Sequence, residues 1–232
     1  MKGSNKQYPL VVFANGTGVP FQEYSPILKH LASWGFIVIG NDDAWSGNGK
    51  SSISSLKFAL ELNEVSNSPF FNKIDKEKIG ISGHSQGGAG AINAVTQYQE
   101  SRFFSSIFTA STTAIPLIED MEVDDWYYHT DEIEIPYFMV AATGQFDSEV
   151  VAPISSLNEN FDKLSEDLPA IMARRKDVDH AQTLTHADGY MTAWFLYTLT
   201  EDEFAREVFE GDNAEIKLNN ENWQDIREQN VD

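Results

Sequence analysis

Residues 78–88 read Lys78-Ile79-Gly80-Ile81-Ser82-Gly83-His84-Ser85-Gln86-Gly87-Gly88, a short apolar run that ends in a glycine-rich turn. Such runs are typical of strands buried on both faces, and a helical pattern follows over residues 86–99. The central serine therefore has G-x-S-x-G spacing at a strand–turn–helix junction, the context that a nucleophile elbow requires. We predict that Ser85 lies on a strained turn whose small neighbours let strand and helix approach each other. The alternative is a glycine-rich turn with an incidental serine.

A helix that begins at this turn would also stabilise negative charge. Backbone N–H groups at a helix N-terminus point to where an oxyanion forms during acyl transfer. An oxyanion hole takes one N–H from the residue after the nucleophile and one from the loop after an early strand. We therefore expect Gln86 to supply the first donor. Asn15-Gly16-Thr17-Gly18 follows an apolar run, and Thr17 is the expected second donor; a simple glycine turn is the alternative there.

Apolar runs and helical patterns alternate outward from the elbow. Strands are expected at 9–14, 36–40, 78–82, 104–110, 136–142 and 169–176, and helices at 24–34, 51–64, 86–99, within 149–164 and at 187–199. This alternation predicts an α/β fold with a mostly parallel central sheet and helices on both faces. Ligands bind beyond the carboxyl ends of the strands in such sheets.

The chain is expected to form a single domain over residues 1–232, since it shows no repeat and no dividing linker. Residues 111–135 are acidic and lack a clean period, so we interpret them as a cap or a pocket-lining insertion. Residues 201–232 are interpreted as a C-terminal extension packed on the domain. Its expected apolar anchors are Phe204, Val208, Phe209, Trp223 and Ile226.

Composition restricts the partners of the chain. It carries 36 Asp and Glu against 16 Lys and Arg, a formal net charge of −20. Such a surface repels phosphate backbones and anionic lipids, so we expect a neutral or weakly charged small molecule and no nucleic acid. Cysteine is absent, which excludes disulfides, thiolate metal sites and a cysteine nucleophile. No apolar run approaches the roughly 20 residues of a membrane-spanning helix.

The first residues, Met1 to Gln7, lack the apolar stretch of a signal peptide. The compartment stays open, because a secreted protein whose leader has been removed would begin in the same way. The oligomeric state is open as well.

A serine nucleophile needs a histidine base and an orienting carboxylate, in the chain order serine, acid, histidine. His180 follows the last expected strand and is the preferred base. His186 lies six residues later, ahead of the last helix, and is the alternative, whereas His129 comes too early in the chain. His84, beside the nucleophile, is interpreted as a packing residue.

Asp147 follows the fifth expected strand immediately and is the expected acid. The competing interpretation is that Asp147 or Ser148 begins the next helix as its N-cap. Asp177 and Asp179 flank His180 in the chain, but neighbouring residues of a loop rarely aim a carboxylate at the imidazole between them. Both are interpreted as solvated charges.

These residues resemble the dienelactone-hydrolase, chlorophyllase and cutinase-like polyesterase branch of the α/β-hydrolases. The similar stretches are residues 12–17, 31–39 and 83–88, then Asp147-Ser148 before Ala152-Pro153, Asp179-His180 and Ala193-Trp194. The resemblance implies an α/β-hydrolase fold and hydrolysis of esters through an acyl-enzyme, without metal or organic cofactor. Its match at Asp179-His180 is a second argument for His180.

The chain departs from this branch at two places. Members usually have strands ahead of the run at Pro9, and only eight residues precede it here, so either the chain is trimmed or the sheet lacks the first N-terminal strands. Polyester-cleaving members carry a substrate-stacking tryptophan after the fourth strand, where this chain has Ser111-Thr112-Thr113-Ala114. Trp45, Phe21 or Trp126 would have to line the pocket instead; packing in the core is the competing interpretation for each.

The sequence therefore predicts an esterase or lipase-like serine hydrolase with Ser85, His180 and Asp147 as its triad. Thioester, lactone, dienelactone, peptide or polyester cleavage would use the same triad, because the pocket and not the triad selects the substrate. A non-catalytic binding protein of the same fold is a third possibility, although such a protein would usually have lost one of the three residues.

Overall fold

A computed structural model describes residues 6–231 of the chain. The expectation about a signal peptide rests on Met1 to Gln7, and residues 1–5 of this stretch lie outside the described residues. In the described part, no helix is long and apolar enough to cross a membrane.

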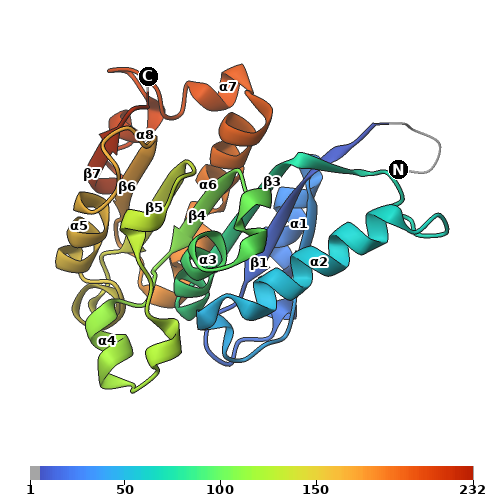
Figure 1. Cartoon of the computed structure of the whole chain (residues 1–232). Coiled ribbons are helices and arrows are strands. Elements are labelled where there is room, and N and C mark those ends of the chain that lie inside the picture. Colours follow the sequence, from blue (N-terminus) through green and yellow to red (C-terminus); the bar gives the residue numbers. More distant parts are fainter. Residues whose placement is uncertain (1–5, 232) are drawn as a thin grey trace.

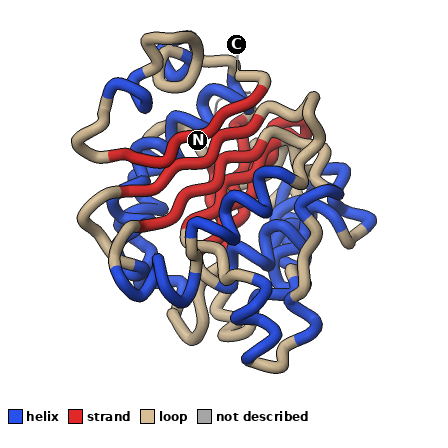
Figure 2. The backbone as a smooth tube through the Cα atoms, turned by 90° about the vertical axis from the view of Figure 1, so that its left-hand side faces the viewer, coloured by secondary structure: helices blue, strands red, loops and turns tan. Residues whose placement is uncertain are grey.

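A twisted sheet of seven strands forms the centre of the molecule (Figures 1 and 2). The strand order is β2-β1-β3-β4-β5-β6-β7. The strands are β1 (Tyr8–Ala14), β2 (Ile37–Gly40), β3 (Ile74–His84), β4 (Ser106–Ala110), β5 (Tyr137–Ala142), β6 (Ala170–Arg175) and β7 (Trp223–Gln229). The first six run parallel and β7 pairs antiparallel with β6. The predicted mostly parallel sheet is confirmed, with β2 at one edge and β7 at the other.

Helices cover both faces of the sheet and divide the core into two clusters (Figure 1). One face carries α1 (Ser25–Ser33) and α6 (Thr183–Thr200), and the other carries α2 (Lys50–Glu64), α3 (Gln86–Thr96) and α5 (Ile154–Asp162). Because both faces are covered, the central strands are mostly apolar and are buried along their length rather than on alternate residues. All five residues of β4 and all six of β5 are buried.

Helix α6 begins at Thr183, four residues before its predicted start. The reason is a capping box just ahead of it, in which the Asp179 side chain accepts the His180 N–H and Gln182 reaches back to the Asp179 N–H. Such a box satisfies backbone donors that the first turn leaves unpaired. The helix therefore starts directly behind the loop that carries His180.

Residues 111–135 contain only short pieces, namely α4 (Ile115–Asp120) and single turns at Asp124–Trp126 and Thr130–Glu132. No period is visible in the sequence because no piece is longer than two turns. Trp126 and Tyr128 are buried and anchor the segment against the face that carries α3 and α5.

The C-terminal residues form α7 (Glu203–Arg206), α8 (Glu215–Leu218) and strand β7, which the sequence did not predict. A register shift interrupts the β6–β7 pairing between Met172 and Arg174, and Asp225 within β7 has φ 54°. A bulge of this kind breaks the two-residue period by which a strand is recognised. Phe209 and Trp223 are buried as expected, but the expectation for Phe204 was wrong, because 83% of it is exposed.

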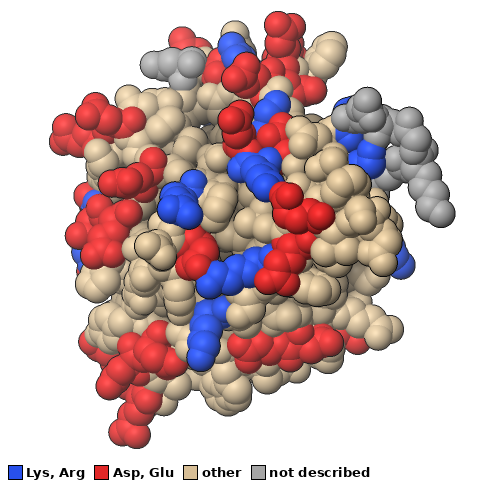
Figure 3. All heavy atoms as spheres, turned by 45° about the vertical axis from the view of Figure 1, so that its right-hand side comes forward, with Lys and Arg blue, Asp and Glu red and all other residues tan. Residues whose placement is uncertain are grey.

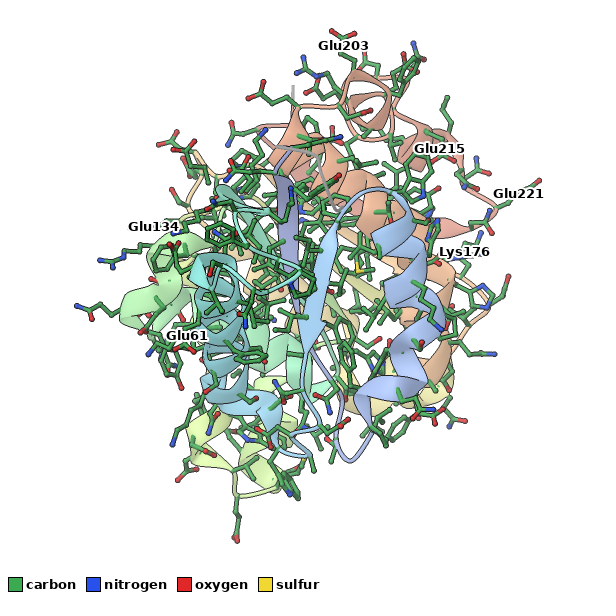
Figure 4. The ribbon with its side chains drawn as sticks, turned by 90° about the vertical axis from the view of Figure 1, so that its right-hand side faces the viewer. Glu61, Glu134, Lys176, Glu203, Glu215 and Glu221 are labelled. Carbon is green, nitrogen blue, oxygen red and sulfur yellow. The ribbon has the colours of Figure 1, made fainter. Side chains whose placement is uncertain are left out.

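Acidic side chains are spread over the surface (Figure 3), with Lys and Arg among them. Figure 4 shows Glu134, Glu203 and Glu221 at the outside of the fold, and all three are exposed. They belong to the stretch before β5, to α7 and to the stretch before β7. On the face shown in Figure 3, the acidic side chains are therefore distributed rather than gathered at one site.

Candidate active site

Ser85 occupies the sharp turn between β3 and α3, with φ 59° and ψ −125°. A positive φ is rare for residues other than glycine and marks a strained backbone. The glycines on either side are required by space. A Cβ at Gly83 would lie 1.9 Å from the Gly87 carbonyl oxygen, and one at Gly87 would lie 2.2 Å from the Ala14 carbonyl oxygen. The predicted strained elbow is present, and its spacing has a steric cause.

Three side chains meet at the carboxyl ends of β3, β5 and β6. His180 Nε2 lies 3.0 Å from Ser85 Oγ, and His180 Nδ1 lies 2.9 Å from Asp147 Oδ1. Ser85 and Asp147 are buried, and His180 is partly buried. The hydrogen bonds run from hydroxyl to imidazole to carboxylate, although the three residues are far apart in the chain.

The second oxygen of Asp147 is held by two further groups. Asp147 Oδ2 accepts the Ser111 hydroxyl at 2.7 Å and the Ala142 N–H at 2.5 Å. Asp147 therefore orients its carboxylate from the end of β5, and its side chain caps no helix, so the N-cap interpretation was wrong. Ser111 stands directly after β4 with φ 49° and also bonds Thr183 Oγ1 at 2.8 Å.

Asp179 is not the solvated charge that the sequence analysis expected. Its carboxylate accepts the backbone N–H groups of Asp147 at 2.8 Å, His180 at 2.8 Å and Phe146 at 3.1 Å. Burial raises the pKa of Asp179, but these three donors outweigh it and hold the pKa below its ordinary value. Asp179 thus ties the loop of Asp147 to the loop of His180.

The other four histidines take no part in the hydrogen bonds between Ser85, His180 and Asp147. His186 is exposed on α6, and His129 lies 3.9 Å from Asp131 on the surface. His30 contacts Asp188 and Trp34. His84 is buried beside the elbow, with its ring stacked on that of His180 at 4.8 Å between centroids.

The loop after β1 brings an unused N–H to the cleft. The Gly16 N–H bonds the Tyr24 hydroxyl, the Gly18 N–H bonds the Ala44 carbonyl, and the Val19 N–H bonds the Gly16 carbonyl. Among the described residues, no such bond takes up the N–H of Thr17. Gln86 is the first residue of α3, so its N–H has no partner within the helix.

Ser85 and His180 line a cleft of about 410 Å³. Its walls are mainly apolar, and segment 111–135 contributes Leu117, Met121 and Trp126. Phe146, Val150 and Val151, which follow or flank Asp147 in the chain, also line the cleft. A larger, open depression of about 810 Å³ lies over α7 and α8. Its lining combines glutamates and asparagines with Phe204, Val208 and Leu218 and includes no serine, histidine or cysteine, so the smaller cleft is the candidate active site.

Residues 24–220 match the PET hydrolase-like family. This match covers most of the chain. The protein belongs to that family. A comparison with the curated proteins finds no match.

Membership confirms the resemblance and the α/β-hydrolase fold that the sequence predicted. It makes this PET hydrolase-like protein a hydrolase of the α/β-hydrolase type that acts on esters or polyesters. In the described residues, no group of three or more His, Asp or Glu side chains gathers where a metal ion could be held.

Within this PET hydrolase-like site, Trp126 lines the cleft from segment 111–135, and its ring packs against Trp45 with 5.3 Å between centroids. Phe21 lies against Phe13 and is not a cleft residue. Neither Ser111 nor Tyr24 was predicted as a site residue from the sequence. For Ser111 a signal existed, since a polar run directly follows a buried strand; for Tyr24 none existed, because its helical spacing indicated only core.

Proposed function

We propose that this protein is a serine esterase that cleaves carboxylic esters through an acyl-enzyme, with Ser85 as nucleophile, His180 as base and Asp147 as acid. One observation carries the proposal: a continuous hydrogen-bonded path from Ser85 Oγ through both nitrogens of His180 to Asp147, at the floor of a cleft. Nucleophile, base and orienting group in this order are the signature of activated serine.

In the proposed reaction, Ser85 Oγ attacks the ester carbonyl carbon while His180 Nε2 takes the hydroxyl proton. The carbonyl oxygen becomes an oxyanion, which the N–H groups of Thr17 and Gln86 stabilise. The C–O bond of the ester then breaks, and His180 gives its proton to the leaving alcohol. Water, deprotonated by His180, attacks the acyl carbon. The bond from this carbon to Ser85 Oγ then breaks, the acid leaves and His180 returns the proton to Ser85 Oγ.

Asp147 keeps the imidazole in the productive tautomer throughout. Its Oδ1 accepts from Nδ1, which leaves Nε2 without a proton and ready to accept one from Ser85. The Ala142 N–H and the Ser111 hydroxyl fix the other oxygen, so the carboxylate cannot rotate away. Charge-assisted hydrogen bonds of this kind also stabilise the imidazolium that forms.

The cleft favours a neutral ester with an apolar acyl group. Leu117, Met121 and Val150 line it, and a net charge of −20 disfavours anionic substrates. We propose that the whole chain works as one domain, with segment 111–135 as a wall of the acyl pocket and residues 201–232 as a packed extension.

The test is turnover of p-nitrophenyl acetate and butyrate by wild type, Ser85→Ala, His180→Ala and His186→Ala. We expect Ser85→Ala and His180→Ala to lose at least about 10³-fold in kcat, because triad members act as a unit. His186→Ala is the matched histidine control and should retain wild-type turnover.

A fluorophosphonate probe checks the nucleophile independently. It should label wild type at Ser85 alone and leave Ser85→Ala unlabelled. Residual turnover by Ser85→Ala within tenfold of wild type, or labelling at another serine, would contradict the proposal.

A further inference from the structure

A buried tyrosine and a buried histidine connect the loops of the candidate active site. Tyr24, from the turn before α1, and His84, next to Ser85, are 6% and 7% exposed. The Tyr24 hydroxyl lies 3.0 Å from the Gly16 N–H and 3.0 Å from His84 Nδ1. His84 Nε2 lies 3.0 Å from the carbonyl oxygen of His180. The triad uses neither side chain.

The direction of these hydrogen bonds follows from chemistry. A carbonyl oxygen only accepts, so His84 Nε2 must carry a proton to bond His180. Burial, and after it the charge of His180, lower the pKa of His84 to about 4, so the ring holds a single proton at neutral pH. His84 Nδ1 is then bare and accepts the Tyr24 hydroxyl proton, while the Tyr24 oxygen accepts the Gly16 N–H.

Each of the three hydrogen bonds thus has a single direction. The chain runs from the Gly16 N–H to Tyr24, from Tyr24 to His84 and from His84 to the His180 carbonyl; we call it the Tyr24–His84 chain. The space around it is tight, because a Cβ at Gly16 would lie 3.0 Å from the Tyr24 hydroxyl and 3.2 Å from His84 Nδ1. Glycine at this position lets the backbone approach closely enough to close the chain.

The Tyr24–His84 chain joins three backbone segments whose relative positions would matter for catalysis. Gly16 precedes Thr17, whose N–H is the proposed oxyanion donor. His84 precedes the nucleophile, and its ring stacks on the base with 30° between the planes. A carbonyl bond at His180 fixes the backbone of the base itself. Positional errors of about 1 Å in such groups cost about 10²-fold in rate.

We infer that Tyr24 and His84 are positioning residues that hold the oxyanion loop and the base in register through a hydrogen-bond chain of fixed direction. This inference rests on the proposed serine-esterase function. The neutral ring of His84 would also let the imidazolium of His180 form without a second positive charge beside it.

Tyr24→Phe and His84→Phe break the chain at its two side chains. For p-nitrophenyl butyrate we expect each variant to lose about 10- to 100-fold in kcat, with KM within about threefold of wild type. The double variant should be no slower than the slower single variant, because either change alone interrupts the same chain. Losses that multiply in the double variant would overturn the inference.

Tyr128→Phe is the matched control. Tyr128 is also a buried tyrosine, hydrogen-bonded to Asn160 on the opposite face of the sheet. It should retain kcat within about twofold, with a melting temperature lowered to a similar extent as in Tyr24→Phe. Equal kcat losses in the two variants would show a general packing effect and overturn the inference.

Two further measurements cover a variant that folds poorly. His84→Gln retains an amide N–H that can reach the His180 carbonyl, so it should recover part of the kcat lost in His84→Phe. Inhibition by butylboronic acid, which forms a tetrahedral adduct at serine, should weaken in parallel with kcat because the adduct needs the oxyanion donors. If Ser85→Ala is inactive and Tyr24→Phe has the kcat of wild type, only the positioning role of the Tyr24–His84 chain is refuted. If Ser85→Ala is active, the proposed function itself is refuted.

Discussion

At the scale of single residues, two carboxylates of the candidate site differ in the groups that they bind. Asp147 faces the imidazole, whereas Asp179 faces only backbone N–H groups and joins two loops. The sequence spacing was sufficient to propose Ser85 and Asp147 as candidates, because an elbow and a strand end are local patterns. It was insufficient for Asp179 and Ser111, whose partners lie in other loops and become neighbours only when the sheet is assembled.

Asp179→Asn is expected to lower kcat/KM about tenfold and the free energy of unfolding by about 1–2 kcal/mol, because the amide loses the charge and turns an N–H toward a backbone donor. Asp177→Asn is the matched control. Asp177 is exposed on the same loop at φ 59°, a conformation that asparagine tolerates. Kinetics and urea unfolding of both variants provide the check, and equal effects would show that Asp179 contributes only its charge.

At the scale of elements, mostly apolar runs located all six parallel strands, because strands buried on both faces have apolar side chains at most positions. Strand β7 was not predicted because it lacks a regular pattern. It is an edge strand with a bulge at Asp225, and its buried and exposed side chains do not alternate. The helical turns of segment 111–135 were not predicted because they are too short to show a period in the sequence. Its contribution to the cleft depends on Thr113, Leu117, Met121 and Trp126, which only tertiary packing brings there.

Shortening the wall formed by α4 tests this element. Leu117→Ala should raise the ratio of kcat/KM for p-nitrophenyl octanoate over acetate by about tenfold, since a pocket enlarged by a few methylenes gains about 1–3 kcal/mol for a longer acyl group. Leu218→Ala, an equivalent change at an exposed leucine of α8 outside the cleft, should leave the ratio unchanged. An unaltered ratio in Leu117→Ala would remove α4 from the acyl pocket.

At the scale of the whole molecule, the pH dependence of folding stability has two sources: the many acidic residues and a few buried titratable groups. The acidic residues are dispersed (Figures 3 and 4), so the net charge of −20 changes stability broadly as they titrate. Several carboxyl groups, among them Asp179 and Asp225, have pKa values below the ordinary range. Their contribution to stability is lost only at pH values below about 4.

His84 produces a pH dependence in a separate window. Burial and the charge of His180 lower its pKa from 6.5 to about 4, against the opposing effects of the His180 carbonyl and Asp147. The unfolded chain therefore binds a proton at this residue between pH 6.5 and 4 that the folded protein does not bind. Folding stability is full above pH 6.5 and falls as the pH is lowered through this window, by about 2 kcal/mol between pH 7 and pH 5.

The measurement is urea unfolding of wild type and His84→Gln at pH 7 and pH 5 at one ionic strength. The dispersed charges affect both proteins equally, so the difference between their pH dependences isolates His84 whatever the absolute stability of the variant. We expect the loss between pH 7 and pH 5 to be smaller by about 2 kcal/mol in His84→Gln. If both proteins lose the same free energy of unfolding between pH 7 and pH 5, His84 takes up its proton in the folded state as well. The Tyr24–His84 chain would then lack the single direction on which its proposed role depends.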